Sequence, residues 1–181
     1  MTIDPGSGLP DCYWVVPAQL LAGEYPCSLR DAEALRKLNA LLDAGIRSFV
    51  DLTESADGLA PYRGIVMRLG ADRGFRVRYR QMSIRDLDIP TTDHMTLILA
   101  HIDHELAQGH PVYVHCWGGI GRTGTVVGCW MREKEGMSAE EAFRRIAQLR
   151  AHTQDVRIPS PQTREQRDFV AKWIPRDAAA V

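Results

Sequence analysis

Short apolar runs rich in β-branched and aromatic residues alternate along the chain with longer segments in which apolar residues recur every three or four positions. Runs of the first kind are typical of buried strands, and segments of the second kind are typical of helices. Strands alternating with helices favour an α/β fold, and we predict a central, mainly parallel sheet of about five strands flanked by helices on both faces. The predicted strands cover residues 13–16, 20–23, 46–52, 75–82 and 111–115.

Capping residues mark the ends of two predicted helices. Ser28 precedes a helical pattern over residues 29–45, in which Gly45 can supply the left-handed residue that ends the helix. Thr92 begins a second pattern with its apolar residues on one side, and Gly109 closes it. Helices of this kind cross over between the strands of a parallel sheet.

Two more helices are predicted near the C-terminus from their capping signals. Ser138 and Glu141 form a capping box before an amphipathic stretch. Ser160, with Pro161 at the first helical position, begins the last helix, which ends near Trp173. The sequence contains no internal repeat and no low-complexity segment.

Length and composition favour one domain. The chain has 181 residues, of which 45% are hydrophobic, enough for one core but not comfortably for two. We predict a single domain over residues 11–174, with flexible tails at residues 1–10 and 175–181. The 22 basic and 23 acidic residues give a formal net charge of −1 and form no basic tract. We therefore expect no nucleic-acid partner.

Nothing in the sequence predicts a targeting or membrane segment. Residues 1–10 lack the charged start and the apolar stretch of a signal peptide. No later apolar run approaches the roughly 20 residues of a membrane-spanning helix. We expect a cytoplasmic monomer with no membrane partner.

Four cysteines occur without a CxxC pair and without the spacing of zinc ligands. Because a chain of this size does not need disulfides to stabilise its core, we expect reduced thiols. Cys129 lies in an apolar stretch and is predicted to be a core residue. The roles of Cys12 and Cys27 stay open, including a regulatory disulfide with Cys116.

A group of histidines could suggest a metal site. His94, His101, His104 and Glu105 fall on the polar side of the helix that begins at Thr92. They lack the HExxH arrangement and partner ligands elsewhere, which favours a solvated helix face. We expect neither a metal nor another cofactor.

The most informative stretch lies between the predicted strand 111–115 and a helix that begins near Arg122. Three of the intervening residues are glycines, which permit a sharp turn. Backbone amides that converge at a helix N-terminus form an anion site, and Cys116 would lie at its centre. This environment and the Arg122 guanidinium favour the thiolate over the thiol. Since a guanidinium fork matches two phosphate oxygens, we predict a thiolate that attacks a phosphate ester.

The stretch HCWGGIGRT, residues 115–123, resembles the HCxxGxGR(S/T) signature of the cysteine-dependent protein tyrosine phosphatases, including their dual-specificity branch. The resemblance covers residues 10–174 loosely and residues 80–170 through motifs. It implies that Cys116 attacks phosphorus, that His115 braces the loop and that Thr123 stabilises the departing thiolate. The implied phosphate-binding residues are Trp117, Gly118, Gly119, Ile120, Gly121 and Arg122.

Phosphate transfer to sulfur leaves an oxygen that needs a proton, and a carboxylic acid on a neighbouring loop could supply it. In many members of the dual-specificity branch, an Asp about thirty residues before the cysteine does so, often in a D-x-x-x-P arrangement. Asp86 matches this pattern, being four residues before Pro90. We assign the proton donor to Asp86, with Asp88 as the alternative.

Hydrolysis of the resulting phosphocysteine requires an ordered water. The stretch PQTREQRDFV, residues 161–170, resembles the QTxxQ segment of the tyrosine-specific phosphatases. The resemblance implies that Gln162 positions the water and that Gln166 supports it. A polar helix start is the alternative interpretation.

Other glycine-loop and cysteine-loop proteins fit less well. The GxGxxG match is followed by a helical stretch rather than by a second strand with an acidic residue, and Thr125 occupies the Walker lysine position. A rhodanese-like sulfurtransferase remains an alternative.

We also expect Tyr62 at the rim of the pocket as a stacking residue and Arg150 on an ordinary helix surface.

The substrate is predicted from the loop residues. Residues 117–120 contain no lysine, unlike phosphoinositide phosphatases, whose charged substrates attract basic loops. We expect a phosphoprotein substrate bearing phosphotyrosine, with tolerance for phosphoserine or phosphothreonine. A phosphoinositide phosphatase and a phosphopeptide-binding pseudophosphatase are the alternatives, although a pseudophosphatase usually lacks the cysteine, the arginine or the acid.

Overall fold

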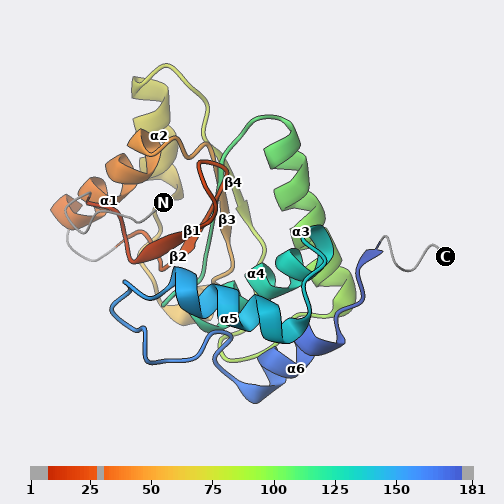
Figure 1. Ribbon diagram of the computed structural model, residues 1–181. Coiled ribbons are helices and arrows are strands. Elements are labelled where there is room, and N and C mark those ends of the chain that lie inside the picture. The colour runs from red at the N-terminus through yellow and green to blue at the C-terminus, as the bar shows by residue number, and fades with distance from the viewer. Residues whose placement is uncertain (1–7, 28–30, 177–181) are drawn as a thin grey trace.

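The computed structural model describes residues 8–27 and 31–176, which form one five-stranded sheet with helices on both faces (Figure 1). The sheet order is β1-β2-β5-β3-β4, and neighbouring strands are parallel except for the antiparallel pair of β1 and β2. The predicted α/β fold with a mainly parallel sheet is confirmed. Each predicted strand overlaps one of the five, although the predicted ranges 46–52 and 75–82 extend beyond the observed strands at both ends. The strands are β1 (Cys12–Val16), β2 (Leu20–Gly23), β3 (Ser48–Asp51), β4 (Arg78–Gln81) and β5 (Val112–His115).

The helices are divided unequally between the two faces of the sheet. Two of them, α1 and α2, cover one face, and the other four cover the opposite face (Figure 1). A short 3-10 helix, η1 (Ser55–Asp57), follows β3. The helices are α1 (Asp31–Asp43), α2 (Arg63–Asp72), α3 (Thr92–Ala107), α4 (Gly121–Lys134), α5 (Ala139–Leu149) and α6 (Arg164–Lys172).

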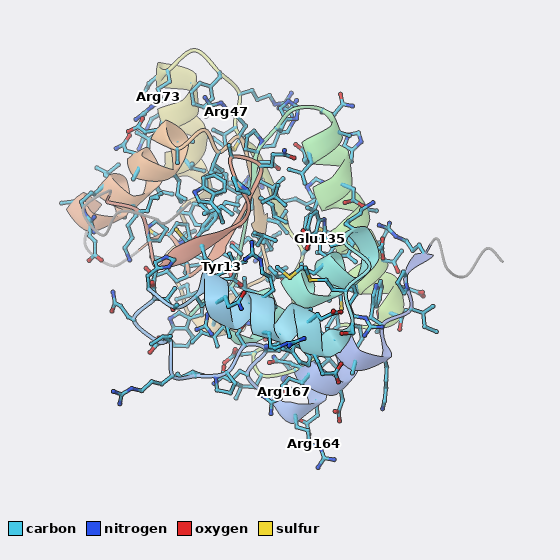
Figure 2. All side chains as sticks on the ribbon, in the orientation of Figure 1. Tyr13, Arg47, Arg73, Glu135, Arg164 and Arg167 are labelled. Carbon is cyan, nitrogen blue, oxygen red and sulfur yellow. The ribbon has the colours of Figure 1, made fainter. Side chains whose placement is uncertain are left out.

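Alternation of side chains along the central strands creates two cores. Phe49 of β3 pairs with Tyr113 of β5, and both belong to the core beneath α1 and α2. The next pair, Val50 and Val114, belongs to the core on the other face, because successive residues of a strand point to opposite sides. Figure 2 shows side chains filling the space on both sides of the sheet.

Most of the predicted helix ends are found. Gly45 and Gly109 have φ angles of +94° and +73°, so both adopt the left-handed conformation expected after a helix. Ser138 and Glu141 form the predicted capping box at the start of α5. Ser28 lies outside the described residues.

The start of the last helix was predicted too early. The helix begins at Arg164, and not at Ser160 or Pro161. Its cap is Thr163, whose hydroxyl accepts a hydrogen bond from the Gln166 amide. In return, the Gln166 side chain accepts a hydrogen bond from the Thr163 amide. This capping box fixes the helix start several residues downstream of the prediction.

Helix α2 was not predicted at all. It buries only Val66 and Gly70, so its apolar positions do not form the repeated pattern that identifies an amphipathic helix.

None of the helices in the described ranges is long and apolar enough to cross a membrane.

The C-terminal segment is tied to the domain by Arg176. Its guanidinium donates hydrogen bonds to Glu133 of α4 and, at 2.9 Å, to Asp103 of α3. The sequence placed Arg176 in a flexible tail, but these two ion pairs fix it against the helices. Residues 1–7 and 177–181, the outer parts of the expected tails, lie outside the described residues.

One edge of the sheet gathers the C-terminal ends of four parallel strands. Gly23, His115, Asp51 and Gln81 are the last residues of β2, β5, β3 and β4, and the register aligns them in one row. The segments that follow these residues therefore emerge side by side. Ligands of open α/β sheets bind at this edge, which is where the predicted catalytic loop begins.

Candidate active site

Residues 116–120 form a turn between the end of β5 and the start of α4. Cys116 is the first residue of the turn and is buried. Two hydrogen bonds hold the turn from outside, since the Tyr25 amide donates to the Trp117 carbonyl at 2.7 Å and the Ser160 hydroxyl donates to the Ile120 carbonyl at 2.7 Å. In both bonds the acceptor is a carbonyl oxygen of the turn. Because α4 begins at Gly121, directly after the turn, Cys116 lies at a helix N-terminus, as predicted.

Two glycines of the turn allow neighbouring segments to approach closely. Gly119 has a φ angle of +68°, and a Cβ atom there would lie 2.4 Å from the carbonyl carbon of Gly23. A Cβ atom on Gly121 would lie 2.9 Å from the side-chain oxygen of Gln166 and 3.3 Å from that of Gln162. Any larger residue would push the turn away from β2 or from the start of α6.

Arg122 extends from the first turn of α4 and its side chain is only 1% exposed. Its Nη1 donates to Asp57 at 2.7 Å and to the Ile84 carbonyl at 3.1 Å. Its Nη2 lies 3.0 Å from an oxygen of Asp86. Burial alone would lower the pKa of Arg122, but the hydrogen bond with Asp57 and the charges of Cys116 and Asp86 outweigh it, and the pKa is raised. The guanidinium is a fixed cation beside the cysteine.

Asp57 is a site residue that the sequence did not reveal. It ends η1, and besides Arg122 it accepts a hydrogen bond from the Glu54 amide at 3.0 Å. No motif marks it, and it lies 65 positions before Arg122 in the sequence. The only available signal was its place shortly after β3, whose end aligns with that of β5.

The two candidate acids occupy different positions. Asp86 is about half exposed and its carboxylate contacts Arg122. The Asp88 carboxylate instead accepts a hydrogen bond from the Ile89 amide at 2.8 Å, within its own loop. Leu87 between them has a φ angle of +60°, an uncommon conformation for a residue with a side chain. The geometry therefore brings Asp86 to the site and turns the carboxylate of Asp88 to its own backbone.

Gln166 connects the start of α6 to the loop that carries the acids. Its side-chain oxygen accepts hydrogen bonds from the amides of Gln162 and Thr163, both at 3.1 Å. Its side-chain nitrogen donates to the Asp88 carbonyl at 3.1 Å. Gln166 is fully buried, whereas Gln162 is exposed next to Gly121. Gln162 therefore faces solvent beside the catalytic turn, where the resemblance implies that it positions a water.

His115, the last residue of β5, is buried beneath the turn. The Tyr62 hydroxyl lies 2.6 Å from its Nε2, and its Nδ1 lies 3.3 Å from the Cys116 carbonyl. A carbonyl only accepts, so Nδ1 carries the proton and Nε2 accepts from Tyr62. Burial lowers the pKa of His115, although the charge of Asp51 opposes this shift. A neutral His115 thus connects the Tyr62 hydroxyl to the backbone carbonyl of Cys116.

The environment of Tyr62 corrects one expectation. Its side chain is 1% exposed and packs edge-on against Tyr25 and Tyr79. It cannot stack on a substrate at the rim of a pocket, because it lies inside the core. Arg150 is also buried rather than on the surface, and it donates to the carbonyls of Asp155 and Ile158 in the segment that leads to α6.

The remaining loop residues divide into buried and exposed positions. The Thr123 hydroxyl is buried and lies 3.5 Å from the Gly23 carbonyl, to which it donates. Gly119 and Ile120 are buried, while Gly118 and Trp117 are exposed. Trp117 and Leu87 each keep 54% of their surface exposed. Trp117 lies in the same turn as Cys116, and Leu87 directly follows Asp86, which contacts Arg122.

The positions of the cysteines bear on the proposed disulfide. Cys12 of β1 pairs with Gly23 of β2, which pairs with His115 of β5. Two strand spacings amount to roughly 9.5 Å, beyond the ~7 Å limit between the Cα atoms of a disulfide. The pairing therefore holds Cys12 farther from His115, the residue before Cys116, than a disulfide between neighbouring strands spans. Cys129 is buried in the core, as predicted.

No group of three or more metal-binding side chains is found in the part of the chain that the structure describes.

Among the described residues, no hydrogen-bond acceptor is paired with Nε of Arg122, and its Nη2 has only the ion contact with Asp86. This edge of the guanidinium can therefore bind two oxygens of one anion.

Comparisons with known proteins show which proteins the chain is similar to. Residues 9–170 match the family PTP-SAK, described as "Swiss Army Knife protein, DSP-PTPase phosphatase domain". The phosphatidylglycerophosphate phosphatase PTPMT2 of Arabidopsis thaliana is 28% identical over 139 residues, which are 72% of this chain and 52% of that protein. The human phosphatidylglycerophosphatase and protein-tyrosine phosphatase 1 is 26% identical over 153 residues, 82% of this chain and 69% of that protein. The chain spans about half the length of the Arabidopsis relative.

Solved structures share the fold at low sequence identity. Tk-PTP in its active form superimposes with a TM-score of 0.71 at 23% identity, covering 95% of this chain and 99% of that one. The kinase associated phosphatase gives a TM-score of 0.70 at 18% identity, with 94% and 95% covered. PTPMT1 in complex with PI(5)P gives 0.68 at 21% identity, with 90% and 93% covered.

Proposed function

Because the chain belongs to the PTP-SAK family of DSP-PTPase phosphatase domains, we propose that it hydrolyses phosphotyrosine in proteins through a phosphocysteine intermediate. The observation that carries the proposal is the guanidinium of Arg122. Asp57 holds its Nη1, which leaves the edge formed by Nε and Nη2 for two phosphate oxygens. A cysteine at a helix N-terminus lies beside that edge.

In the first step, the thiolate of Cys116 attacks phosphorus and the bond from phosphorus to the tyrosine oxygen breaks. Asp86 gives its proton to that oxygen, so a neutral phenol leaves. Arg122 and the amides of the turn stabilise the charge on the phosphoryl oxygens. Donors that are already in place contribute most to the rate of such a transfer.

In the second step, a water held by Gln162 attacks the phosphocysteine. Asp86, now ionised, takes the proton of the water, and the bond from sulfur to phosphorus breaks to release phosphate. The thiolate of Cys116 is restored, and the Thr123 hydroxyl is available nearby to stabilise it. His115 serves as a brace rather than as a base, because burial keeps it neutral and its two ring nitrogens are engaged.

The contact between Asp86 and Arg122 has to break for this cycle. The Asp86 carboxyl group must leave Nη2 of Arg122 to reach the oxygen of the leaving group. A bound phosphate dianion would take the place of Asp86 on Nη2.

The substrate proposal is supported by the residues around the nucleophile. Residues 117–120 contain no lysine, and Trp117 and Leu87 offer apolar surface where an aromatic ring would enter. A lipid phosphomonoester is the second candidate, because both curated relatives described above carry the name of phosphatidylglycerophosphate phosphatases. A pseudophosphatase is disfavoured because Cys116, Arg122 and Asp86 come together.

Rates on matched substrates test the proposal. We expect hydrolysis of phosphotyrosine peptides, slower hydrolysis of phosphoserine and phosphothreonine peptides, and little activity on phosphoinositides or phosphatidylglycerophosphate. Cys116→Ser should abolish turnover of every substrate. Equal, negligible turnover by both forms would support a binding protein instead, and a strong preference for a lipid would overturn the protein substrate.

A further inference from the structure

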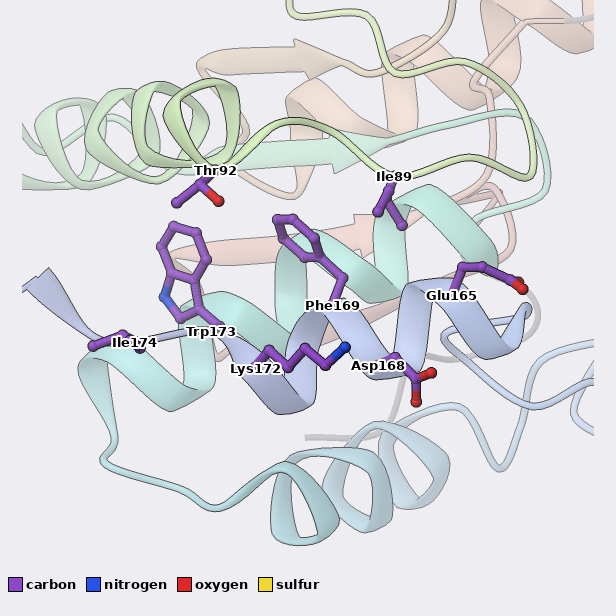
Figure 3. Close-up of a pocket in the computed structure, with 8 residues that line it drawn as sticks. All are labelled: Ile89, Thr92, Glu165, Asp168, Phe169, Lys172, Trp173 and Ile174. Carbon is purple, nitrogen blue, oxygen red and sulfur yellow. The ribbon is translucent and has the colours of Figure 1, made fainter.

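A groove of about 460 Å³ lies beside the loop of the candidate acids, between the start of α3 and one side of α6 (Figure 3). We call it the α6 groove. In the close-up, the rings of Phe169 and Trp173 point from α6 toward Ile89 and Thr92. Its volume lies within the range of about 300 to 1,000 Å³ that is usual for ligand pockets. Its lining residues are Ile89, Thr92, Glu165, Asp168, Phe169, Lys172, Trp173 and Ile174.

The floor of the groove is apolar and held in place. Trp173 is buried and its indole nitrogen donates to Glu133 at 3.2 Å. The ring of Phe169 packs against it with 6.0 Å between centroids. Ile174 keeps 70% of its surface exposed at one end, and Ile89 is exposed at the other. Exposed apolar residues gathered on one surface mark sites of interaction.

The loop of the candidate acids and the start of α6 connect the groove to the candidate active site. Ile89 directly follows Asp88, whose carbonyl accepts the hydrogen bond from Gln166. Phe169 and Trp173 lie five and nine residues after the start of α6, or about 8 and 14 Å along the helix axis. An extended peptide advances about 3.3 Å per residue. Two to four residues of an extended peptide would therefore span the distance from the start of α6, beside the turn, to this floor.

The charges at the rim indicate what the groove accepts. Glu165 and Asp168 are exposed carboxylates, and Lys172 is the one cation in the lining. Asp168 lies 3.7 Å from Arg164, the first residue of α6, which projects from the helix (Figure 2). Among the described residues, no ion pair involves Glu165, which lies next to Arg164 in the first turn of the helix. Carboxylates in this position repel the phosphate groups of a lipid surface and attract a basic side chain.

We propose that the α6 groove is a second substrate-binding site, which takes a large apolar side chain two to four residues from the phosphotyrosine. A basic residue next to that side chain faces Glu165. This inference rests on the proposed hydrolysis of phosphoproteins and names a sequence preference within that class.

Phosphotyrosine peptides test the inference. A series carries one leucine at each position two to four residues before or after the phosphotyrosine in a background of alanine and serine. We expect leucine at one of these positions to raise kcat/KM about tenfold over the peptide without leucine, as burial of part of one side chain allows. Ile174→Glu should remove this gain. Leu97→Glu, at a residue of α3 that is 58% exposed and outside the groove, should retain it.

Turnover of phenyl phosphate separates the two proposals, because this substrate is too small to reach the groove. If the unaltered protein hydrolyses phenyl phosphate but all peptides react alike, the groove does not select the substrate and the inference fails alone. If Ile174→Glu lowers the rate on lipid phosphomonoesters in vesicles and not on peptides, the groove binds lipid and the inference is wrong. If neither phenyl phosphate nor any peptide is hydrolysed, the proposed function fails first.

Discussion

The contact between Asp57 and Arg122 offers the sharpest test of the site, because the sequence did not reveal it. The two side chains meet at 2.7 Å and both are buried. A hydrogen bond to a charged group contributes about 1.5 to 3 kcal/mol to stability, and one between neutral groups contributes about 0.5 to 1.5 kcal/mol. Asp57→Asn keeps the shape and loses the charge, so it should cost about 1.4 kcal/mol, which corresponds to a tenfold lower rate.

We expect the loss in Asp57→Asn to fall on kcat rather than on KM. Arg122 would be less well oriented in the transition state, while removal of a negative charge would favour phosphate binding in the ground state. Asp57→Ala removes the partner entirely, so kcat should fall about a hundredfold. It should also lower the free energy of unfolding by about 3 kcal/mol, because a buried guanidinium is left without its anchor.

Steady-state rates with phenyl phosphate and unfolding in urea measure both effects. Asp72→Asn, which changes an exposed carboxylate of α2, is the matched control and should alter neither. The reasoning is refuted if both variants at Asp57 fold and keep kcat within twofold of the unaltered protein. A higher KM with an unchanged kcat would instead mean that Asp57 acts on substrate binding.

Three further predictions follow from contacts described above. Asp86→Asn should lower kcat by about 10² to 10⁴ for an ester with a poor leaving group such as phenol, and far less for an ester of p-nitrophenol. Asp88→Asn should keep kcat within about tenfold of the unaltered protein. The reverse order of the two variants would make Asp88 the acid. Gly119→Ala should lower stability by at least about 2 kcal/mol and abolish activity, measured by urea unfolding and initial rates, because both its φ angle and the Gly23 backbone oppose a Cβ atom. The free energy of unfolding should fall as the pH drops below about 6.5, since the unfolded chain then protonates His115 and the folded one does not; His115→Gln should show a smaller fall between pH 7 and pH 5.

Contiguous features of the site were predictable from the sequence, and long-range contacts were not. The turn from Cys116 to Arg122 follows from a buried run, glycines and a helix start in one short stretch. Asp57 reaches Arg122 only because β3 lies next to β5, an adjacency that no local pattern encodes. The D-x-x-x-P resemblance favoured Asp86 over Asp88, but the directions of the two carboxylates could not be predicted, because they depend on the left-handed turn at Leu87 between them.

Similar reasons explain the errors in the fold. Residue type alone suggested an exposed role for Tyr62 and for Arg150, but both have hydrogen-bond partners inside the protein. The start of α6 was misplaced because Ser160 resembles a cap in sequence. In the fold its hydroxyl is instead bonded to the Ile120 carbonyl of the catalytic turn.

The side-chain amide of Gln166 connects the segment that carries Gln162 to the loop that carries Asp86 and Asp88. In the proposed mechanism, the loop carrying Asp86 acts when the ester is cleaved and again when the phosphocysteine is hydrolysed, whereas Gln162 acts only in the second half-reaction. A shortened side chain at residue 166 would therefore slow both half-reactions together. In rapid-mixing experiments, such a variant would show a slower burst and a slower steady state, while a change at Gln162 alone would spare the burst.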